Sequence, residues 1–297
     1  MKRLQFGMAC ALLAGMSAQP LHARKPAEMP APAVQPVDAA EIENAIEARR
    51  YDQAKAMIER AKLARQDDPR IDLALAEYWL ATGSTPQAAV AFQALAATPG
   101  VRARALQGQG VAAFKLNRLD EAEASLKAAV AADPGLHRAW TALGATADRR
   151  GDWTLADKAY GEALKLSPQP EIVRLNRGYS LLIRHRYAEA ITDLTAAVTA
   201  MPNSEIARNN LRIALALAGR YEEAFSGADG RDLFRQLNNV GYAALMRGDL
   251  QVAEGYFNRA IEMSDIYYQP AHSNLVYLEG LRRAAAAPAT KPGEGRP

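Results

Sequence analysis

Residues able to carry out catalysis or hold a cofactor are few in this sequence of 297 residues. The four histidines, His22, His137, His185 and His272, are scattered, and none has a second histidine or a carboxylate pair at the spacing of a metal site. The only cysteine, Cys10, lies in an apolar N-terminal run, so a processed chain would lack both a disulfide and a thiol nucleophile. We therefore predict no metal, no cofactor and no enzymatic activity.

Two short motifs look like functional signatures, and helix packing and turn formation explain both. Gly108, Gly110 and Ala113 have the spacing of a dinucleotide-binding fingerprint, but that fingerprint requires a preceding strand, and here the glycines lie within a predicted helix. The triplet Arg-Gly-Asp occurs at 150–152 and 247–249, where a helix is expected to end and where glycine suits the turn. The G-x-S-x-G elbow of serine hydrolases is absent from the sequence. These patterns favour a structural role over nucleotide binding, adhesion or hydrolysis.

The composition predicts a globular protein without a nucleic-acid partner. Hydrophobic residues make up 49% of the chain and charged residues 23%, which is enough apolar material for a large packed core. Lysine and arginine number 36 against 33 aspartates and glutamates, so the net charge is only +3. Such a balance lacks the excess of basic residues that nucleic-acid binding requires.

The first 23 residues, MKRLQFGMACALLAGMSAQPLHA, have the pattern of a secretory signal peptide. A basic start at Lys2 and Arg3 precedes an apolar run from Leu4 to Met16 and a small residue at Ala23. The run is shorter than the roughly 20 residues that a membrane-spanning helix needs. We expect export to the periplasm. An alternative remains open in which Cys10 is lipidated, although leucine is missing three residues before it.

Two segments rich in proline and alanine flank the region expected to fold. Residues 24–37 read as an extended linker and residues 285–297 as a disordered tail, because neither shows apolar periodicity. Between them, residues 38–284 contain no second linker. We predict one continuous architecture rather than two domains.

A period of 34 residues runs through the middle of the chain. It is marked by four equally spaced alanines, Ala122, Ala156, Ala190 and Ala224. A glycine lies 12 residues before each of the first three alanines and a proline 12 residues after it, at Gly110, Gly144, Gly178, Pro134, Pro168 and Pro202. The spacing predicts antiparallel helix pairs in which the glycine faces the alanine, a left-handed glycine ends the first helix, and the proline ends the second.

The repeated unit resembles the tetratricopeptide repeat family. One window matches its motif at eight positions, Trp140, Leu143, Gly144, Ala147, Ala156, Tyr160, Ala163 and Pro168. The resemblance implies an all-α, right-handed α-solenoid of about seven helix pairs with a C-terminal capping helix from Gln269. It also implies protein or peptide partners bound on the concave wall that the first helices form. The segment FSGADGRDLF after Ala224 lacks the landmarks, so a short or broken second helix and a kink are expected there.

A regular set of side chains on this wall predicts a peptide-binding groove. Asparagines recur two residues before the packing glycine or its equivalent, and large apolar residues follow three positions later. The six residues are Asn176, Asn210, Asn239, Tyr179, Ile213 and Tyr242. An amide can both donate to and accept from the backbone of an extended peptide. A second interpretation stays open, in which the asparagines only tie one helix to the next and the apolar strip is buried.

The same wall carries four cations nearer the N-terminus, Arg104, Lys115, Arg138 and Arg149. They predict either a surface for acidic partners or a solvated charged face.

The C-terminal repeats suggest a narrower relationship. The segment NNLRIALALAGRYEEAF, followed after a glycine-rich break by LNNVGYAALMRGDLQVAEGYFNRAIEMSDIYY, is similar to the repeats of the TadD family of tight-adherence (Flp) pilus assembly. This resemblance implies a scaffold for pilus or secretion-system assembly that is usually associated with the outer membrane. The sequence departs from that family in lacking a good lipidation motif. The alternatives are a periplasmic adaptor for cell-wall or polysaccharide synthesis enzymes, and an enzyme with accessory repeats, for which no remaining segment is long enough.

Overall fold

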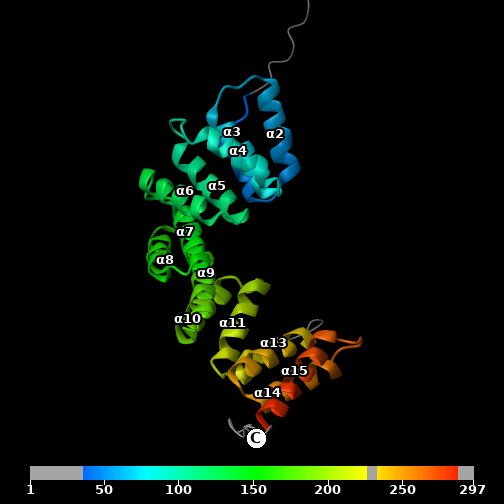
Figure 1. Ribbon diagram of the computed structural model, residues 1–297. Coiled ribbons are helices and arrows are strands. Elements are labelled where there is room, and N and C mark those ends of the chain that lie inside the picture. Colours follow the sequence, from blue (N-terminus) through cyan, green and yellow to red (C-terminus); the bar gives the residue numbers. More distant parts are fainter. Residues whose placement is uncertain (1–35, 226–232, 287–297) are drawn as a thin grey trace, which may run out of the picture. The chain divides into compact units, whose positions relative to one another are not determined.

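The computed structural model describes residues 36–225 and 233–286, and every regular element in these residues is a helix. All of the helices belong to the unit that begins at Val37 (Figure 1). The predicted signal peptide, most of the predicted linker and residues 287–297 lie outside the described residues. Within the part that the structure describes, no helix is both long enough and apolar enough to cross a bilayer.

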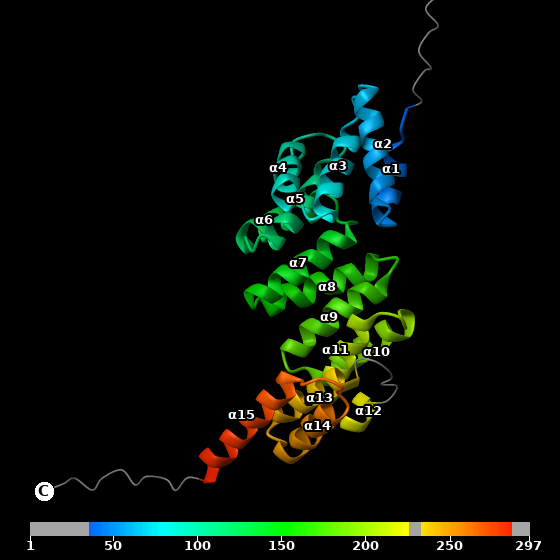
Figure 2. The same ribbon diagram turned by 90° about the vertical axis from the view of Figure 1, so that its right-hand side faces the viewer.

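Fourteen of the described helices form seven consecutive pairs, which confirms the predicted α-solenoid. The pairs are α1 (Ala39–Glu47) with α2 (Tyr51–Leu63), α3 (Pro69–Ala81) with α4 (Thr85–Leu95), α5 (Arg102–Lys115) with α6 (Leu119–Ala132), α7 (His137–Arg150) with α8 (Trp153–Leu166), α9 (Pro170–Ile183) with α10 (Tyr187–Ala200), α11 (Glu205–Leu217) with α12 (Tyr221–Phe225), and α13 (Leu233–Arg247) with α14 (Leu250–Glu262). A further helix, α15 (Gln269–Ala286), packs on α13 and α14 as the predicted capping helix (Figure 2).

The connection inside each pair turns at a residue in the left-handed region. Glycine takes this position in four pairs, at Gly83, Gly151, Gly219 and Gly248, with φ between +75° and +91°. This confirms the prediction that a left-handed glycine ends the first helix. The other three pairs place Arg49, Asn117 and His185 there, with φ from +57° to +61°. Glycine adopts this conformation without the steric cost that other residues bear, which explains its preference at the corner. The helix ends before the predicted prolines are also confirmed, since α6, α8 and α10 end at Ala132, Leu166 and Ala200.

The packing glycines make room for large side chains as well as for a close backbone approach. A Cβ atom at Gly144 would lie 2.9 Å from Cε1 of Tyr160, and one at Gly178 would lie 2.7 Å from Cγ of Leu194. At Gly110 the same atom would meet Leu126 at 2.5 Å and the carbonyl of Ala122 at 3.2 Å. The expectation that the glycine simply faces an alanine therefore needs correction. The small alanine lets the second helix come near, and a large residue one turn later fills the space over the glycine.

The pair α11 and α12 departs from this arrangement. Arg212 takes the position of the packing glycine and is only 8% exposed. Its Nε donates to the carbonyl of Ala224 at 3.0 Å and its Nη1 donates to Oδ1 of Asn209 at 2.9 Å. Burial, with the nearby Arg208, lowers the pKa of Arg212. Helix α12 is described over five residues only, and the break predicted after it lies outside the described residues.

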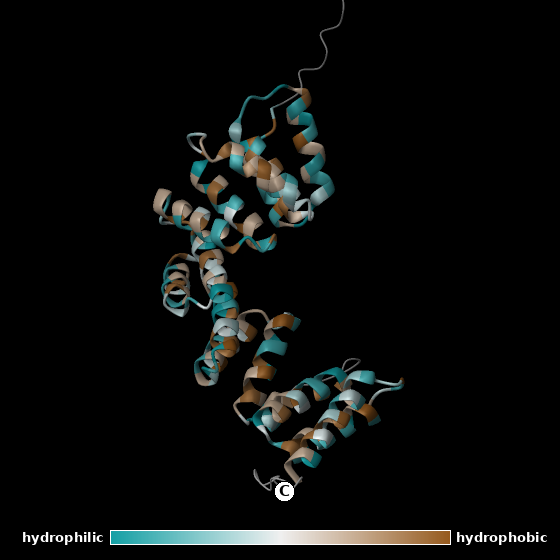
Figure 3. Cartoon of the chain, in the orientation of Figure 1, coloured by the Kyte–Doolittle hydropathy of each residue, from teal (hydrophilic) through white to brown (hydrophobic). Residues whose placement is uncertain are grey.

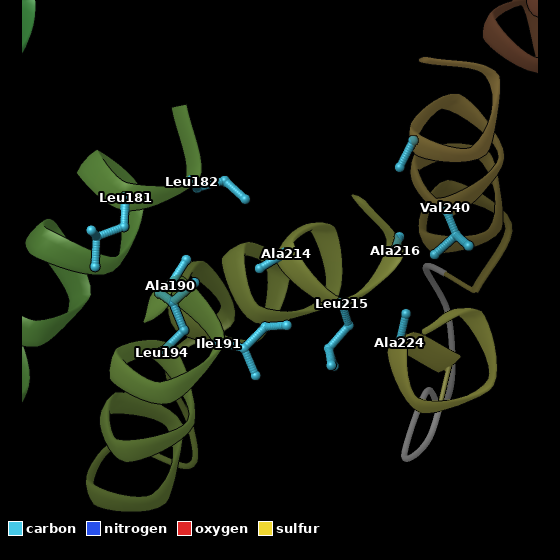
Figure 4. Packing of buried hydrophobic residues seen from close by; sticks show 11 residues of the cluster. Leu181, Leu182, Ala190, Ile191, Leu194, Ala214, Leu215, Ala216, Ala224 and Val240 are labelled. Carbon is cyan, nitrogen blue, oxygen red and sulfur yellow. The ribbon is translucent and has the colours of Figure 1, made fainter. Parts of the chain in front are cut away.

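The core continues across this irregular pair. Leu215 of α11 lies between Ile191 of α10 and Val240 of α13, and these residues belong to one buried cluster that also includes Leu194 and Ala224 (Figure 4). Apolar and polar residues alternate around the helices along the chain (Figure 3). Each pair thus buries one side of its helices against its neighbours, as stacked repeats require.

Candidate binding face of the first helices

The first helices of the seven pairs together form a continuous surface, which we call the first-helix face. Each first helix contacts the first helix of the next pair, from α1 with α3 through to α11 with α13. Three recesses lie along this face, and each is formed mainly by three successive first helices. We call them the N-terminal, middle and apolar recesses.

The N-terminal recess, between α1, α3 and α5, is about 290 Å³ in volume, and ion pairs join two of its lining carboxylates to Arg104. Nη1 of Arg104 lies 2.7 Å from Oε1 of Glu43, and its Nη2 lies 2.9 Å from Oε1 of Glu77. Burial raises the pKa of Glu77 despite the opposing effect of Arg104. Because Arg104 already holds two carboxylates, it offers little charge to an acidic ligand.

The other predicted cations of this region are also engaged within the chain. Arg138 pairs with Glu47 at 2.7 Å, and Arg149 donates to Oδ1 of Asn117 at 2.8 Å while lying over a phenylalanine ring. Lys115 donates to the carbonyl of Leu80 at 3.2 Å. Carboxylates therefore neutralise Arg104 and Arg138 within the chain, whereas Lys115 and Arg149 bond only to uncharged oxygens and keep their positive charge. For these two cations the surface for acidic partners stays a prediction.

The middle recess, between α5, α7 and α9, is about 370 Å³ in volume. It combines positive charge with several apolar side chains. Its lining includes Phe114, Lys115, His137, Arg138, Ile172 and Asn176. Burial and the neighbouring Arg138 lower the pKa of His137.

The apolar recess is the largest of the three, at about 710 Å³. It lies between α9, α11 and α13, with the start of α10 at its edge. Its lining residues are Leu182, Ile183, His185, Tyr187, Ile213, Leu217, Asn239, Tyr242, Ala243, Met246 and Arg247. Three of its large apolar side chains are substantially exposed, Ile183 at 40%, Tyr242 at 49% and Met246 at 64%. Large apolar side chains exposed around a hollow are the usual mark of an interaction site.

Helical periodicity explains how α13 supplies this lining. Tyr242 and Met246 follow Asn239 by three and seven residues, so all three lie on one side of the helix. Val240 and Leu245 point to other sides and are buried. The same pattern on α11 places Ile213 in the recess while Ala214 and Leu215 enter the core.

The six residues predicted from the sequence are brought together only in part. Ile213, Asn239 and Tyr242 line the apolar recess, whereas Asn176 lines the middle recess. Tyr179 and Asn210 line none of the three recesses. The predicted groove is thus divided between two hollows, and its peptide-binding role stays a prediction.

The asparagines of the predicted ladder do not tie helices together. The side chains of Asn176, Asn210 and Asn239 make no hydrogen bond to any other residue that the structure describes. The helix-tying role belongs to a neighbouring residue, because Nδ2 of Asn274 on α15 donates to Oδ1 of Asn238 on α13 at 3.0 Å. An exposed amide such as that of Asn239 can bond to a ligand.

Sequence reasoning missed the part of the apolar recess that comes from the corner between α9 and α10. His185 and Tyr187 lie there, with Nδ1 of His185 and Oη of Tyr187 2.6 Å apart. No landmark of the repeat marks a corner residue as a binding residue. Only the packing of α10 beside α11 brings these two side chains to the recess.

Polar groups elsewhere in the helix pairs satisfy one another. Asp148 accepts from Oγ of Ser180 at 2.6 Å and from Oη of Tyr160 at 2.8 Å, and burial raises the pKa values of both Asp148 and Tyr160. Asp193 is buried beneath Arg174 and Arg177. Over the described ranges, no group of three or more histidine, cysteine, aspartate or glutamate side chains is placed to hold a metal ion.

Stacked antiparallel helix pairs with this period define an α-solenoid, and the family can be stated directly. The model of the tetratricopeptide repeat family matches residues 40–102, 87–137 and 141–205, which together cover more than half of the chain. The chain belongs to the tetratricopeptide repeat family. Repeats of this family typically mediate protein–protein interactions, and its members are generally non-catalytic scaffolds.

Solved structures share the fold at low sequence identity. A chain of the APC/C hetero-tetramer Cut9–Hcn1 has a TM-score of 0.60 at 14% identity, with 81% of this chain and 48% of that chain covered. This chain therefore spans about half the length of that relative. PilW, described as a widely conserved type IV pilus biogenesis factor, has a TM-score of 0.54 at 18% identity, covering 70% and 98%. A thermophilic tetratricopeptide repeat protein of Thermus thermophilus has a TM-score of 0.51 at 22% identity, covering 63% and 96%.

Identities this low show the fold alone. Among curated proteins, none matches the sequence significantly.

Proposed function

We propose that this chain is a scaffold that binds a segment of a partner protein on the first-helix face, with the apolar recess as the main anchoring point. One observation carries the proposal. Ile183, Tyr242 and Met246 expose large apolar surfaces around a hollow of about 710 Å³, beside the exposed amide of Asn239. Covering such a surface removes apolar area from water and so favours association.

The chemistry of the recess fits an extended segment with a large apolar side chain. Tyr242 and Met246 would pack on that side chain, because a tyrosine ring is a rigid amphipathic surface and methionine adapts to irregular shapes. The amide of Asn239 would exchange hydrogen bonds with the ligand backbone, which orients the segment without reading its sequence. Because ion pairs already engage the charged groups of the N-terminal recess, we expect this part of the first-helix face to contribute little to partner binding.

We propose export to the periplasm and a role in pilus (Flp/Tad) or secretion-system assembly as the setting, with association to the outer membrane through a partner. Three independent features support it. The N-terminal 23 residues have the pattern of a signal peptide. The C-terminal repeats are similar to those of the TadD family. PilW, a pilus biogenesis factor, has the same fold.

Mass spectrometry of the protein isolated from its host tests the export proposal. Cleavage after Ala23 would leave a mature chain that begins at Arg24. An intact Met1 contradicts export, and a diacylated chain that begins at Cys10 replaces cleavage at Ala23 with lipidation.

Deletion of the gene tests the assembly role. We expect surface fimbriae and adherence to be lost while the pilin precursor is still made. Normal piliation would contradict the proposal. Loss of envelope integrity with intact pili would instead favour an adaptor for cell-wall or polysaccharide synthesis enzymes.

A further inference from the structure

The outer side of α15, the capping helix, exposes large apolar side chains where a capping helix is expected to be polar. Val276 is 70% exposed and Tyr277 is 59% exposed, and the preceding turn adds Ile266 and Tyr267, both more than 70% exposed. Terminal repeats of a solenoid normally present a polar outer face, because no neighbour covers it. This end of the described solenoid therefore has the character of an interface.

The opposite side of α15 is firmly packed, so the exposed residues do not result from a detached helix. Ala271 and Leu278 are fully buried against α13 and α14. Asn274 donates to Asn238, and Nη2 of Arg282 lies 2.8 Å from Oε2 of Glu254 on α14. Helix α15 thus belongs to the solenoid on one side and faces solvent on the other.

The regular first helices show how α15 is oriented. The helices α7 and α9 each bury two residues seven positions apart, Ala139 with Thr146 and Val173 with Ser180. Of these, Ala139, Val173 and Ser180 lie against the preceding pair. Ala271 and Leu278 are the matching residues of α15, since they are seven positions apart and buried against the preceding pair. Helix α15 therefore packs as a first helix does.

This match assigns a structural position to Val276. The packing glycine lies two residues before the second member of each buried couple, at Gly144 on α7 and Gly178 on α9, and there it contacts the second helix of its own pair. Val276 lies two residues before Leu278 and so takes the same position. Within the described residues no second helix follows α15. The exposed side is therefore the place where a first helix of this fold normally receives an antiparallel partner.

Neither the adjoining sequence nor the first helix, α1, supplies large apolar side chains to cover it. Residues 287–297, APATKPGEGRP, contain three prolines and two glycines and no large apolar side chain that could cover an apolar face. The first helix, α1, exposes Glu41, Asn44 and Glu47, and so it offers no apolar complement for a head-to-tail contact.

We propose that two copies of this chain form a dimer by pairing their α15 helices antiparallel about a two-fold axis beside Val276 and Tyr277. Each α15 then receives from the other copy the antiparallel partner that its exposed side lacks. Ser273 and Gly280 are exposed small residues about one turn to either side of that point. The two-fold axis sets Ser273 of one copy opposite Gly280 of the other, so the helices can approach closely.

The charges of α15 permit this contact. Arg282 pairs with Glu254, and Nη2 of Arg283 lies 3.1 Å from Oε2 of Glu279. Each arginine near the axis therefore arrives with its own carboxylate, and pairing two copies does not bring unneutralised like charges together.

Sedimentation velocity over a range of concentrations tests the dimer, with the chain expressed from its full-length gene. We expect a reversible monomer–dimer equilibrium. The double change Val276→Asp and Tyr277→Asp is expected to raise the dimer dissociation constant at least about tenfold, because buried aromatic residues dominate such interfaces. The matched control is Tyr179→Asp on α9, a tyrosine 51% exposed on the first-helix face, which should leave the equilibrium unchanged. Thermal unfolding checks that both variants fold.

Disulfide trapping tests the geometry, in a background with Cys10→Ser. Mixing the Ser273→Cys and Gly280→Cys variants should give crosslinked dimers faster than either variant alone. A monomer at every concentration, or a dimer unaffected by the α15 substitutions, overturns the proposal. Preferential crosslinking of each variant to itself overturns the antiparallel arrangement. A monomer that binds lipid vesicles through Val276 and Tyr277 also overturns it and assigns the face to a membrane.

Discussion

The middle and apolar recesses are built from the same repeat and differ in volume and in which side chains they expose. Each is formed by three successive first helices, yet their volumes are about 370 and 710 Å³. The middle recess places Lys115, Arg138 and His137 beside several apolar side chains. The apolar recess gathers Ile183, Ile213, Tyr242 and Met246 with the amide of Asn239 and the guanidinium of Arg247. Stacking therefore fixes where a recess lies, and the few side chains that stacking leaves exposed decide what the recess can bind.

The two recesses also adjoin pairs of different regularity. Beside the middle recess, the pair α7 and α8 packs Tyr160 directly over Gly144. Beside the apolar recess, the pair α11 and α12 has Arg212 in place of the glycine, bonded to the carbonyl of Ala224. The larger hollow thus coincides with the repeat that departs from the pattern. We expect substitutions in the packed pair α7 and α8 to affect mainly the stability of the fold. We expect substitutions of the exposed side chains of the apolar recess to affect mainly partner binding.

The largest effect is expected from a charge placed in the apolar recess. Tyr242→Asp should weaken binding of the natural partner about 100-fold, or about 3 kcal/mol, as for a central aromatic anchor. The matched control is Ile172→Asp, an exposed apolar residue of the middle recess, which should change binding by less than about threefold. Affinity is measured for the partner that crosslinking captures in the host cell. A larger effect of Ile172→Asp would reverse the assignment of the two recesses.

The second effect concerns the packing of the regular pair. Gly144→Ala should lower the free energy of unfolding by about 1 to 3 kcal/mol, because the new Cβ would lie 2.9 Å from the buried Tyr160 ring. Gly161→Ala on α8 is the control, since its Cβ would meet no atom within 4 Å. That change should stabilise the helix by up to about 1 kcal/mol. Equal unfolding midpoints for the two variants would show that the pair tolerates repacking.

A smaller effect distinguishes the two asparagines of neighbouring first helices. Asn239→Ala should weaken partner binding about tenfold, the effect of one lost hydrogen bond in a desolvated site. Asn210→Ala should leave affinity nearly unchanged, because Asn210 lies outside the recesses. Neither change should lower the melting temperature. A loss of stability with unaltered binding would restore the helix-tying interpretation.

The smallest effect is a dependence on alkaline pH at the irregular pair. Burial and a hydrogen bond to Asp249 raise the pKa of Tyr221 to about 12, from an ordinary value of 10.0. The folded chain keeps this proton longer than the unfolded chain, so the stabilisation is complete below about pH 10 and is lost as the pH rises toward about 12. Tyr221→Phe should therefore reduce the fall in unfolding free energy over this range, measured by urea denaturation. An identical fall in the variant would contradict the role of Tyr221.

The repeat, the helix pairs and their ends could all be predicted from the amino-acid sequence. These features follow from local physics, because helical periodicity sets the buried face, glycine supplies the left-handed corner and proline ends the second helix. The capping helix α15 could be predicted from the sequence in the same way. Three of the six predicted groove residues, Ile213, Asn239 and Tyr242, line one recess, and two of them, Ile213 and Tyr242, occupy matching positions on adjacent first helices.

Which of these side chains meet depends on the packing of the pairs in three dimensions. Arg104 is neutralised by Glu43, 61 residues earlier in the chain, and no local pattern records that pairing. The corner residues His185 and Tyr187 reach the apolar recess through the packing of neighbouring pairs, while Tyr179, on the predicted strip, does not. A period of 34 residues determines which residues occupy equivalent positions in successive helix pairs. The distances between helices depend instead on the volumes of the side chains packed between them, and these differ from pair to pair.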